Sequence, residues 1–267
     1  MGGSSLKGCV ALITGGGGEI GSAIARKFAE EGANIAVGDL DLEKAKTAVA
    51  AIRASGGQAE AFSLDVASPL SCGEAVDGCV RMFGYLTSLI NVAAAPPSRG
   101  TVEGLTLEDW NKTLAVNLTG AFLTCKYAVP EMRRAGGGSI TNIASQLGHV
   151  GMPGNSAYCT SKAALIFFTR VLAMDHASDN IRANTISPGA IATQRLIGRS
   201  GGSFEAATKL HGPRHLLGRL GLPEEVAGAA AYLASPVAAF VTATDLLVDG
   251  GYVAFKGTVD AKLKPSL

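Results

Sequence analysis

A glycine-rich turn near the start of the chain constrains the fold most strongly. Residues 9–14 form a short apolar run typical of a buried parallel strand, residues 15–21 (GGGGEIG) follow, and residues 22–31 have helical spacing of apolar side chains. Residues 34–39 then predict a second strand, so the opening is one β-α-β unit. Such a turn presents backbone N–H groups and a helix N-terminus to an anion. The opening therefore predicts a pyrophosphate-binding turn.

The alternation of strand and helix continues along the chain. Further strands are predicted at 59–66, 86–92, 139–144, 181–187 and 245–249. Helical patterns separate them, at 41–55, 70–83, 106–134, 158–175 and 223–233. Pro130 marks a kink or restart within 106–134. Repeated β-α units with right-handed crossovers predict an α/β fold, a doubly wound, Rossmann-like parallel sheet of about seven strands with helices on both faces. We expect residues 1–267 to form a single dinucleotide-binding and catalytic domain.

Composition narrows the class of protein. The hydrophobic fraction is 47% and the mean hydropathy is +0.27, which indicates a large core. A net charge of +1 without long runs of one sign argues against nucleic acid or an anionic membrane as partner. The 5 cysteines are scattered without a C-x-x-C pair, so neither a disulfide framework nor a metal site is predicted. Without a signal-like start or a run of about 20 apolar residues, we expect a cytoplasmic protein.

An acidic residue ends the second predicted strand and bears on the choice of coenzyme. Asp39 lies 18 positions after Gly21, where a carboxylate accepts hydrogen bonds from ribose hydroxyls and repels a 2′-phosphate. Neither Gly18 nor Leu40 is basic, so the sequence offers no counter-charge for NADP. We therefore predict NAD as the cofactor.

Tyr158 and Lys162 form a candidate acid/base pair. In a helix they stand at i and i+4 on one face. A nearby ammonium lowers the pKa of a phenol, which is ordinarily about 10, and makes it a plausible general acid/base. Tyr-x-x-x-Lys is common by chance, so the pair gains meaning only from its context. A Tyr packed on a helix beside a solvated Lys is the alternative.

The histidines are weaker candidates. His149 follows Ser145 by four residues, and an exposed turn residue is favoured over a substrate contact. His211 and His215 are separated by Gly212 and Pro213, so a helical metal pair is improbable. They are interpreted as surface or substrate-loop residues.

Taken in order, these motifs resemble the short-chain dehydrogenase/reductase family from about residue 6 to residue 253. The matching pieces are Thr14-Gly15-x-x-x-Glu19-Ile20-Gly21, Asp65-Val66, Asn91-Val92-Ala93-Ala94, Asn117, Ser145, Tyr158-x-x-x-Lys162, Pro188-Gly189 and Val248-Asp249-Gly250-Gly251. Ser145 precedes Tyr158 by 13 positions, the separation that the family's pattern uses. Each piece is weak alone, but the order and spacing are specific.

The resemblance implies a catalytic tetrad of Asn117, Ser145, Tyr158 and Lys162. Tyr158 would exchange a proton with the substrate oxygen, and Ser145 would hydrogen-bond the same oxygen. Lys162 would lower the Tyr158 pKa and hold the nicotinamide ribose. Asn117 would hold a proton-relaying water through its backbone, at an irregularity in its helix.

The resemblance also implies the coenzyme contacts, with Tyr158 and Lys162 among them. The others are Gly15, Gly18, Glu19 and Ile20 at the phosphates, Asp39 and Leu40 after the second strand, Asp65 and Val66 at the adenine, Asn91 and Ala93 on its ribose side, and Pro188, Gly189, Ile191 and Thr193 at the nicotinamide.

Glu19 departs from the family pattern, which has glycine there. The simpler hypothesis points its head group to solvent at little cost. The sharper one is weakened NAD binding, because a carboxylate near a pyrophosphate is repelled by about 1 to 4 kcal/mol, or a carboxylate that leans toward the substrate cleft.

The expected substrate is a secondary alcohol or its ketone. Residues 96–104 and a lid at about 193–218 would form the pocket, and the apolar content of the lid favours a hydrophobic or cyclic substrate such as a diol, terpenoid or steroid. An NADPH-dependent ketoreductase and a non-catalytic nucleotide-binding scaffold are the alternatives. The resemblance further implies a homo-oligomer, a tetramer or a dimer, joined through the helices at 106–134 and 158–175 and the C-terminal segment.

Overall fold

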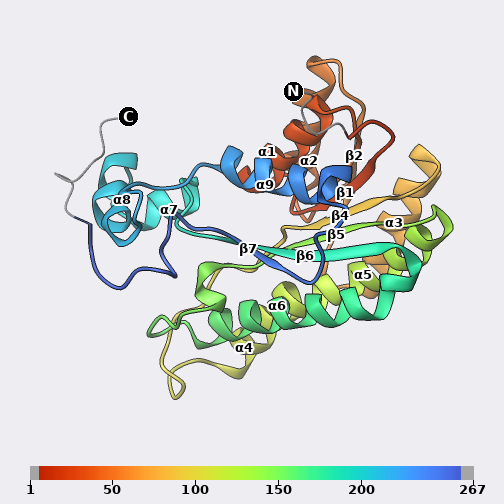
Figure 1. The fold of residues 1–267 in the computed structure, drawn as a ribbon. Coiled ribbons are helices and arrows are strands. Elements are labelled where there is room, and N and C mark those ends of the chain that lie inside the picture. Colours follow the sequence, from red (N-terminus) through yellow and green to blue (C-terminus); the bar gives the residue numbers. More distant parts are fainter. Residues whose placement is uncertain (1–5, 260–267) are drawn as a thin grey trace.

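The computed structural model describes residues 6–259 and is built on one parallel sheet (Figure 1). Its strands are β1 (Val10–Thr14), β2 (Asn34–Asp39), β3 (Ala59–Ser63), β4 (Ser88–Asn91), β5 (Gly138–Ile143), β6 (Ile181–Pro188) and β7 (Asp245–Val248). Their order is β3-β2-β1-β4-β5-β6-β7, and every neighbouring pair is parallel. The predicted fold class is confirmed.

Helices cover both faces of the sheet (Figure 1). One face carries α1 (Glu19–Glu30), α2 (Leu42–Ala54) and α9 (Pro223–Ala234). The other carries α3 (Pro69–Phe83), α5 (Gly120–Arg134) and α6 (Ser156–His176), with α4 (Leu107–Leu114) packed against α6. Each face has its own core: Phe28 is fully buried on the first and Leu89 on the second. Burying one such side chain stabilises the fold by roughly 1.5–3 kcal/mol.

The long helix predicted at 106–134 is interrupted, but not at Pro130. A π-helical segment, Ala115–Thr119, separates α4 from α5, and α5 continues through Pro130 to Arg134. A π-bulge widens one helical turn, which misaligns the backbone carbonyls there, and such bulges are frequent at functional sites. The kink expected from proline is thus wrong in position, and the irregularity contains Asn117.

The carboxyl ends of the central strands lie level with one another. Thr14 is the register partner of both Gly38 and Asn91, and Asn91 is that of Asn142. The strand order reverses between β1 and β4, and ligands of open α/β sheets bind in the crevice at such a point. The fold therefore places this crevice beside the glycine-rich turn.

Residues 193–218 lie beyond the carboxyl end of β6, at the left of Figure 1. They contain α7 (Gln194–Arg199), α8 (Phe204–His211) and a 3-10 turn, Gly212–Arg214. The sequence predicted short helices here without placing them. Next to this segment, residues 189–192 pair with the chain before α9 through an isolated parallel bridge between Ile191 and Gly221.

Candidate active site

The glycine turn is shaped by close contacts that exclude side chains. Gly15 has φ +63°, and a Cβ there would lie 2.8 Å from the Ala93 Cα. A Cβ at Gly21 would lie 2.3 Å from the Gly15 carbonyl oxygen. Gly18, the N-cap of α1, provides no side-chain cap for the first turn of that helix. This arrangement fits a phosphate ligand, because the N–H groups of a first helical turn lack intrahelical partners.

Asp39 is held against this turn. Its Oδ2 accepts a hydrogen bond from the Gly17 N–H at 2.9 Å, and its Oδ1 accepts one from the Asp41 N–H at 3.0 Å. The neighbouring Leu40 is 73% exposed. The predicted coenzyme residues at the ends of β1 and β2 are thus brought together.

The next two strand ends contribute differently. Asp65 is exposed, whereas Val66 is buried against Gly120. The Asn91 side chain is used within the fold: its Nδ2 donates to Asn142 Oδ1, and its Oδ1 accepts from Thr124 Oγ1, both at 2.8 Å. The Ala93 N–H is also used within the fold, because it donates to Thr14 Oγ1 at 3.3 Å.

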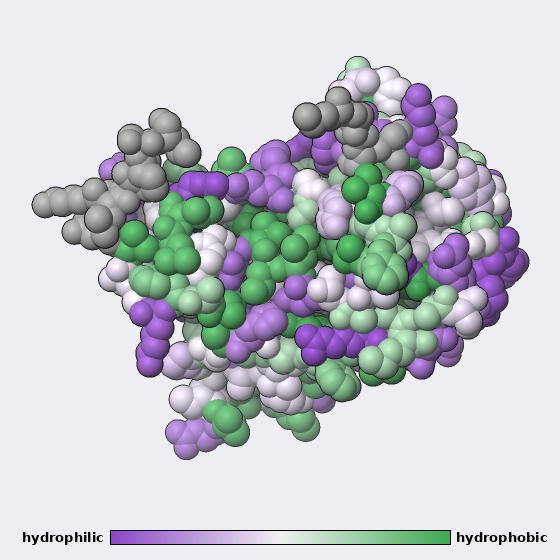
Figure 2. All heavy atoms as spheres, in the orientation of Figure 1, coloured by the Kyte–Doolittle hydropathy of each residue, from purple (hydrophilic) through white to green (hydrophobic). Residues whose placement is uncertain are grey.

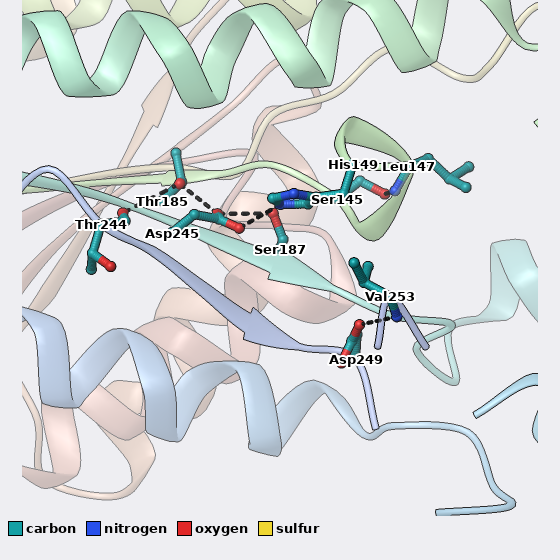
Figure 3. Close-up of polar contacts among 9 residues, drawn as sticks. All are labelled: Ser145, Leu147, His149, Thr185, Ser187, Thr244, Asp245, Asp249 and Val253. Atoms are coloured by element: carbon teal, nitrogen blue, oxygen red, sulfur yellow. Dashed lines mark hydrogen bonds and ion pairs between the residues drawn. The ribbon is translucent and has the colours of Figure 1, made fainter. Parts of the chain in front are cut away.

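Ser145 and Tyr158 approach each other from consecutive elements. Ser145 follows β5 and begins a 3-10 turn, Gln146–Gly148, in which its Oγ accepts the Leu147 N–H at 3.1 Å (Figure 3). Tyr158 stands in the first turn of α6 and is half-buried. Burial raises the Tyr158 pKa, while the hydrogen bond with Ser145 and the nearby cation Arg195 oppose that rise.

Lys162 is buried beside this pair. Its Nζ donates to the Ile143 carbonyl oxygen at 2.7 Å and lies 5.9 Å from the centroid of the Tyr158 ring. Burial lowers the Lys162 pKa to about 8. The ammonium is directed at Ile143, and Lys162 is not among the groups that shift the Tyr158 pKa here, so the lowering by Lys162 stays a prediction.

Asn117 uses its side chain to fix its surroundings. Its Oδ1 accepts the Ala95 N–H at 2.8 Å, and its Nδ2 donates to Ser161 Oγ at 3.1 Å. Both partners come from segments next to the site. A small cavity of about 10 Å³ adjoins Asn117, which is about enough for one water molecule. Its lining includes Thr14, Asn91, Asn117 and Ile143.

His149 anchors the turn that carries Ser145 (Figure 3). His149 is exposed, as the favoured interpretation predicts, yet its Nε2 lies 2.7 Å from Asp245 Oδ2 at the start of β7. The buried Asp245 also accepts hydrogen bonds at Oδ1 from Thr185 and Ser187, at 2.5 and 2.9 Å. Sequence reasoning missed this pair, since 96 positions separate its members and neither stands in a motif.

The loop after β6 rests on a buried histidine. The Ala190 N–H donates to His215 Nε2 at 3.2 Å, and His215 Nδ1 lies 2.9 Å from the His211 carbonyl oxygen. These partners assign a neutral ring with its proton on Nδ1. Of the two predicted positions, the surface is wrong for His215, because it is 2% exposed; it lies within the 193–218 segment, with its ring against Gly189. Within residues 6–259, no three His, Cys, Asp or Glu side chains are grouped as metal ligands.

Glu19 is exposed but not simply solvated. Both of its carboxylate oxygens accept the Gln194 N–H, at 2.8 and 3.0 Å. The residue is exposed, as the simpler hypothesis expects, but its head group also accepts a hydrogen bond, and this contact links the glycine turn to the first residue of α7.

Comparisons with known proteins agree with this geometry. A family model described as enoyl-(acyl carrier protein) reductase matches residues 17–253. The 2,5-dichloro-2,5-cyclohexadiene-1,4-diol dehydrogenase LinX of Sphingobium indicum is 41% identical, over 92% of this chain and 97% of that protein. The D-threitol dehydrogenase of Mycolicibacterium smegmatis is 39% identical, over 92% and 94%.

A solved structure is similar over the same range. The crystal structure of a short-chain type dehydrogenase/reductase from Mycobacterium marinum matches with a TM-score of 0.86 and 34% identity, covering 93% of this chain and 96% of that one. Both the sequence and the fold are thus shared over almost the whole length. The chain belongs to the short-chain dehydrogenase/reductase family of oxidoreductases.

Proposed function

We propose that this protein is an NAD-dependent dehydrogenase that interconverts a cyclic secondary alcohol and its ketone. One observation carries the proposal: Ser145, Tyr158 and Lys162 lie close together, at the same edge of the sheet as the glycine-rich turn that fits a phosphate. Bound NAD would supply the hydride acceptor at nicotinamide C4. The chain's own residues then have to orient the alcohol and move its proton.

Each member of the tetrad has a role in that proton transfer. The Tyr158 oxygen takes the proton of the substrate hydroxyl, which Ser145 Oγ also hydrogen-bonds. Lys162 Nζ has three donor hydrogens, and only one is needed for Ile143, so the others can serve a ribose and the phenolate. The backbone of Asn117 holds a relaying water in the adjoining cavity.

A buried ammonium argues against a non-catalytic scaffold. Burial disfavours the charged form of Lys162, as its lowered pKa shows. A module that only binds the nucleotide could use Lys162 for the ribose, but it would not need the Tyr158 hydroxyl beside it. A proton-transfer site gives a reason to retain both side chains.

Asp39 supports NAD rather than the NADPH-dependent alternative. Replacing Asp39 with alanine is expected to lower the ratio of kcat/KM with NAD to kcat/KM with NADP at least about tenfold, because the carboxylate favours ribose hydroxyls and repels a 2′-phosphate. Asp39→Asn keeps an acceptor for the Gly17 N–H, so it shows the effect of removing the charge alone. Asp77→Ala, an exposed change on α3, is the control. An unchanged ratio in both Asp39 variants contradicts the ribose contact.

The substrate class is supported by the relatives and by the surface of the 193–218 segment. One relative is named for a cyclic diol and the other for an open-chain sugar alcohol. Phe204, Leu210 and Leu217 are each about half exposed or more on this segment, where Figure 2 shows hydrophobic surface. An apolar lid fits a ring better than a hydrated open chain.

An activity screen tests the proposed function. Cyclohexanol, 1,2-cyclohexanediol and threitol would each be offered with NAD and with NADP, and the nicotinamide absorbance followed. The proposal expects the highest kcat/KM for a cyclic alcohol with NAD. Preference for threitol would refute the cyclic assignment, and preference for NADP would refute the coenzyme assignment.

We also propose a homo-oligomer in the cytoplasm. By length and composition alone, α6 with the turn after it is apolar enough to cross a membrane, and 44% of its most apolar window is buried inside the fold. Phe122 on α5 and Phe167 on α6 are exposed and line one apolar hollow. Met174, which is also exposed, lies about two turns further along α6 than Phe167. A second copy would cover this surface, and sedimentation equilibrium should detect a dimer or tetramer; a monomer at micromolar concentration would refute it.

A further inference from the structure

The contact between Glu19 and Gln194 joins two ends of the coenzyme cleft. Glu19 is the first residue of α1, in the turn suited to the pyrophosphate, and Gln194 is the first residue of α7. The segment just before Gln194 is the Pro188–Thr193 run assigned to the nicotinamide. A side chain from the phosphate end therefore holds the backbone at the nicotinamide end, across 175 positions of sequence.

The local electrostatics favour this bond. The Gln194 N–H belongs to a first helical turn and has no intrahelical partner, while Thr193, the N-cap, bonds the Leu196 N–H instead. The Glu19 carboxylate lies at the N-terminus of α1 as well as that of α7, and both helix dipoles stabilise a negative charge there. A hydrogen bond to an ionised acceptor is also stronger than one to a neutral acceptor.

The far end of the 193–218 segment is fastened separately. Arg219 forms a two-pronged ion pair with Glu225, at 2.9 and 2.7 Å, and the Leu217 N–H donates to the Gly250 carbonyl oxygen at 3.2 Å. The Glu19 bond thus secures the entry end, next to α7. That helix also carries Arg195, which is close enough to influence Tyr158.

We propose that Glu19 is a positioning residue that fastens α7 over the coenzyme cleft and slows the release of the coenzyme. The inference rests on the proposed binding of a nicotinamide dinucleotide. For the coenzyme to leave past α7, the Gln194 bond has to break. Loss of the carboxylate should therefore speed release.

Simple charge repulsion predicts the opposite result. If Glu19 acted only by repelling the pyrophosphate, removing its charge would tighten binding, and the effect would fade in salt because the side chain is exposed. A fastening role depends on a hydrogen-bond acceptor, whereas repulsion depends on charge. Glutamine separates the two, because it retains an acceptor oxygen without the charge.

Stopped-flow release of NADH from the wild type, Glu19→Ala and Glu19→Gln tests the proposal, with Glu30→Ala as the control. Glu30 is exposed at the other end of the same helix, so its loss changes the net charge equally. We expect about a tenfold faster release for Glu19→Ala, the size of a lost charge-assisted hydrogen bond. The release rate of Glu19→Gln should stay within about threefold of the wild-type rate, and the release rate of Glu30→Ala should equal the wild-type rate.

Hydrogen exchange of the coenzyme-free protein gives a second readout. The amides of residues 194–199 should exchange faster in Glu19→Ala than in the wild type or Glu30→Ala. If both Glu19 variants released NADH more slowly than the wild type, and if about 1 M salt abolished that difference, charge repulsion would explain the role of Glu19 and the proposal would be wrong. Unchanged release and exchange in Glu19→Ala would also overturn it. Failure of the wild type to bind NADH would instead refute the proposed function, and this inference with it.

Discussion

Replacing Tyr158 with phenylalanine is expected to lower kcat about 10³-fold, within the range typical of a lost general acid/base. The substitution removes one oxygen and leaves the ring, which stands half-buried in the first turn of α6. The proposed coenzyme contacts at the ends of β1 and β2 do not involve that oxygen. The dissociation constant for NADH should therefore stay within about threefold of the wild-type value.

Steady-state kinetics and NADH fluorescence titration measure the two quantities. Tyr127→Phe, on α5, removes a phenol oxygen outside the site and is the matched control. Ser145→Ala tests the neighbouring hydroxyl and should lower kcat less, because the proton acceptor remains. Activity within about tenfold of the wild type in Tyr158→Phe would remove Tyr158 from the proton transfer.

Replacing Lys162 with methionine is expected to lower activity about 10²-fold or more and to stabilise the coenzyme-free protein at neutral pH. The two effects share one cause. The ammonium is buried, and its pKa falls from 10.5 to about 8. That difference corresponds to about 3 kcal/mol, and loss of the hydrogen bond to Ile143 returns about 1 kcal/mol.

The pH dependence fixes the sign of this effect. Between pH 8 and 10.5 the unfolded chain holds a proton on Lys162 that the folded chain has released, so wild-type stability rises with pH through that window. The penalty is complete below about pH 8 and absent above about 10.5. The stabilisation by Lys162→Met should thus be about 2 kcal/mol at pH 7, and by about pH 10.5 it should give way to a loss of about 1 kcal/mol, because only the missing hydrogen bond to Ile143 remains.

Urea unfolding of the wild type and of Lys162→Met at both pH values measures that difference. Lys126→Met, an exposed change on α5, controls for the loss of a positive charge. A Lys162→Met protein that is less stable than the wild type at pH 7 would show that the ammonium is well compensated in the fold. Full activity in that variant would remove Lys162 from the site.

Local sequence patterns predicted the elements that hold the site because those patterns have local causes. Asn34–Asp39 is a strand with the predicted bounds, and the glycine turn is shaped by close backbone contacts that only glycine permits at Gly15. The assignment of Ser145 and Tyr158 to the site follows from the order and spacing of the motifs. In a parallel sheet the carboxyl ends of neighbouring strands lie at the same edge, so residues that follow those strands come together whatever the rest of the sequence is.

What the sequence did not predict depends on contacts between distant segments. Pro130 suggested a helix break that is absent, whereas the interruption at Ala115–Thr119 has no local signal such as proline and was expected only from the family resemblance at Asn117. The Glu19 contact with Gln194 joins positions whose proximity exists only once β6 and α7 are placed. The Tyr158 pKa likewise depends on how much water the folded chain removes, and the spacing of Tyr158 and Lys162 contains no information on that burial.

Isotope transfer tests the central claim most directly. The wild-type protein would be incubated with NAD and a cyclic secondary alcohol carrying deuterium on the carbinol carbon, and the coenzyme analysed by mass spectrometry. We expect reduced coenzyme that has gained one deuterium, with almost none formed by Tyr158→Phe in the same time. Reduced coenzyme without deuterium, or no reduction with any cyclic alcohol and NAD, would contradict direct hydride transfer from the alcohol.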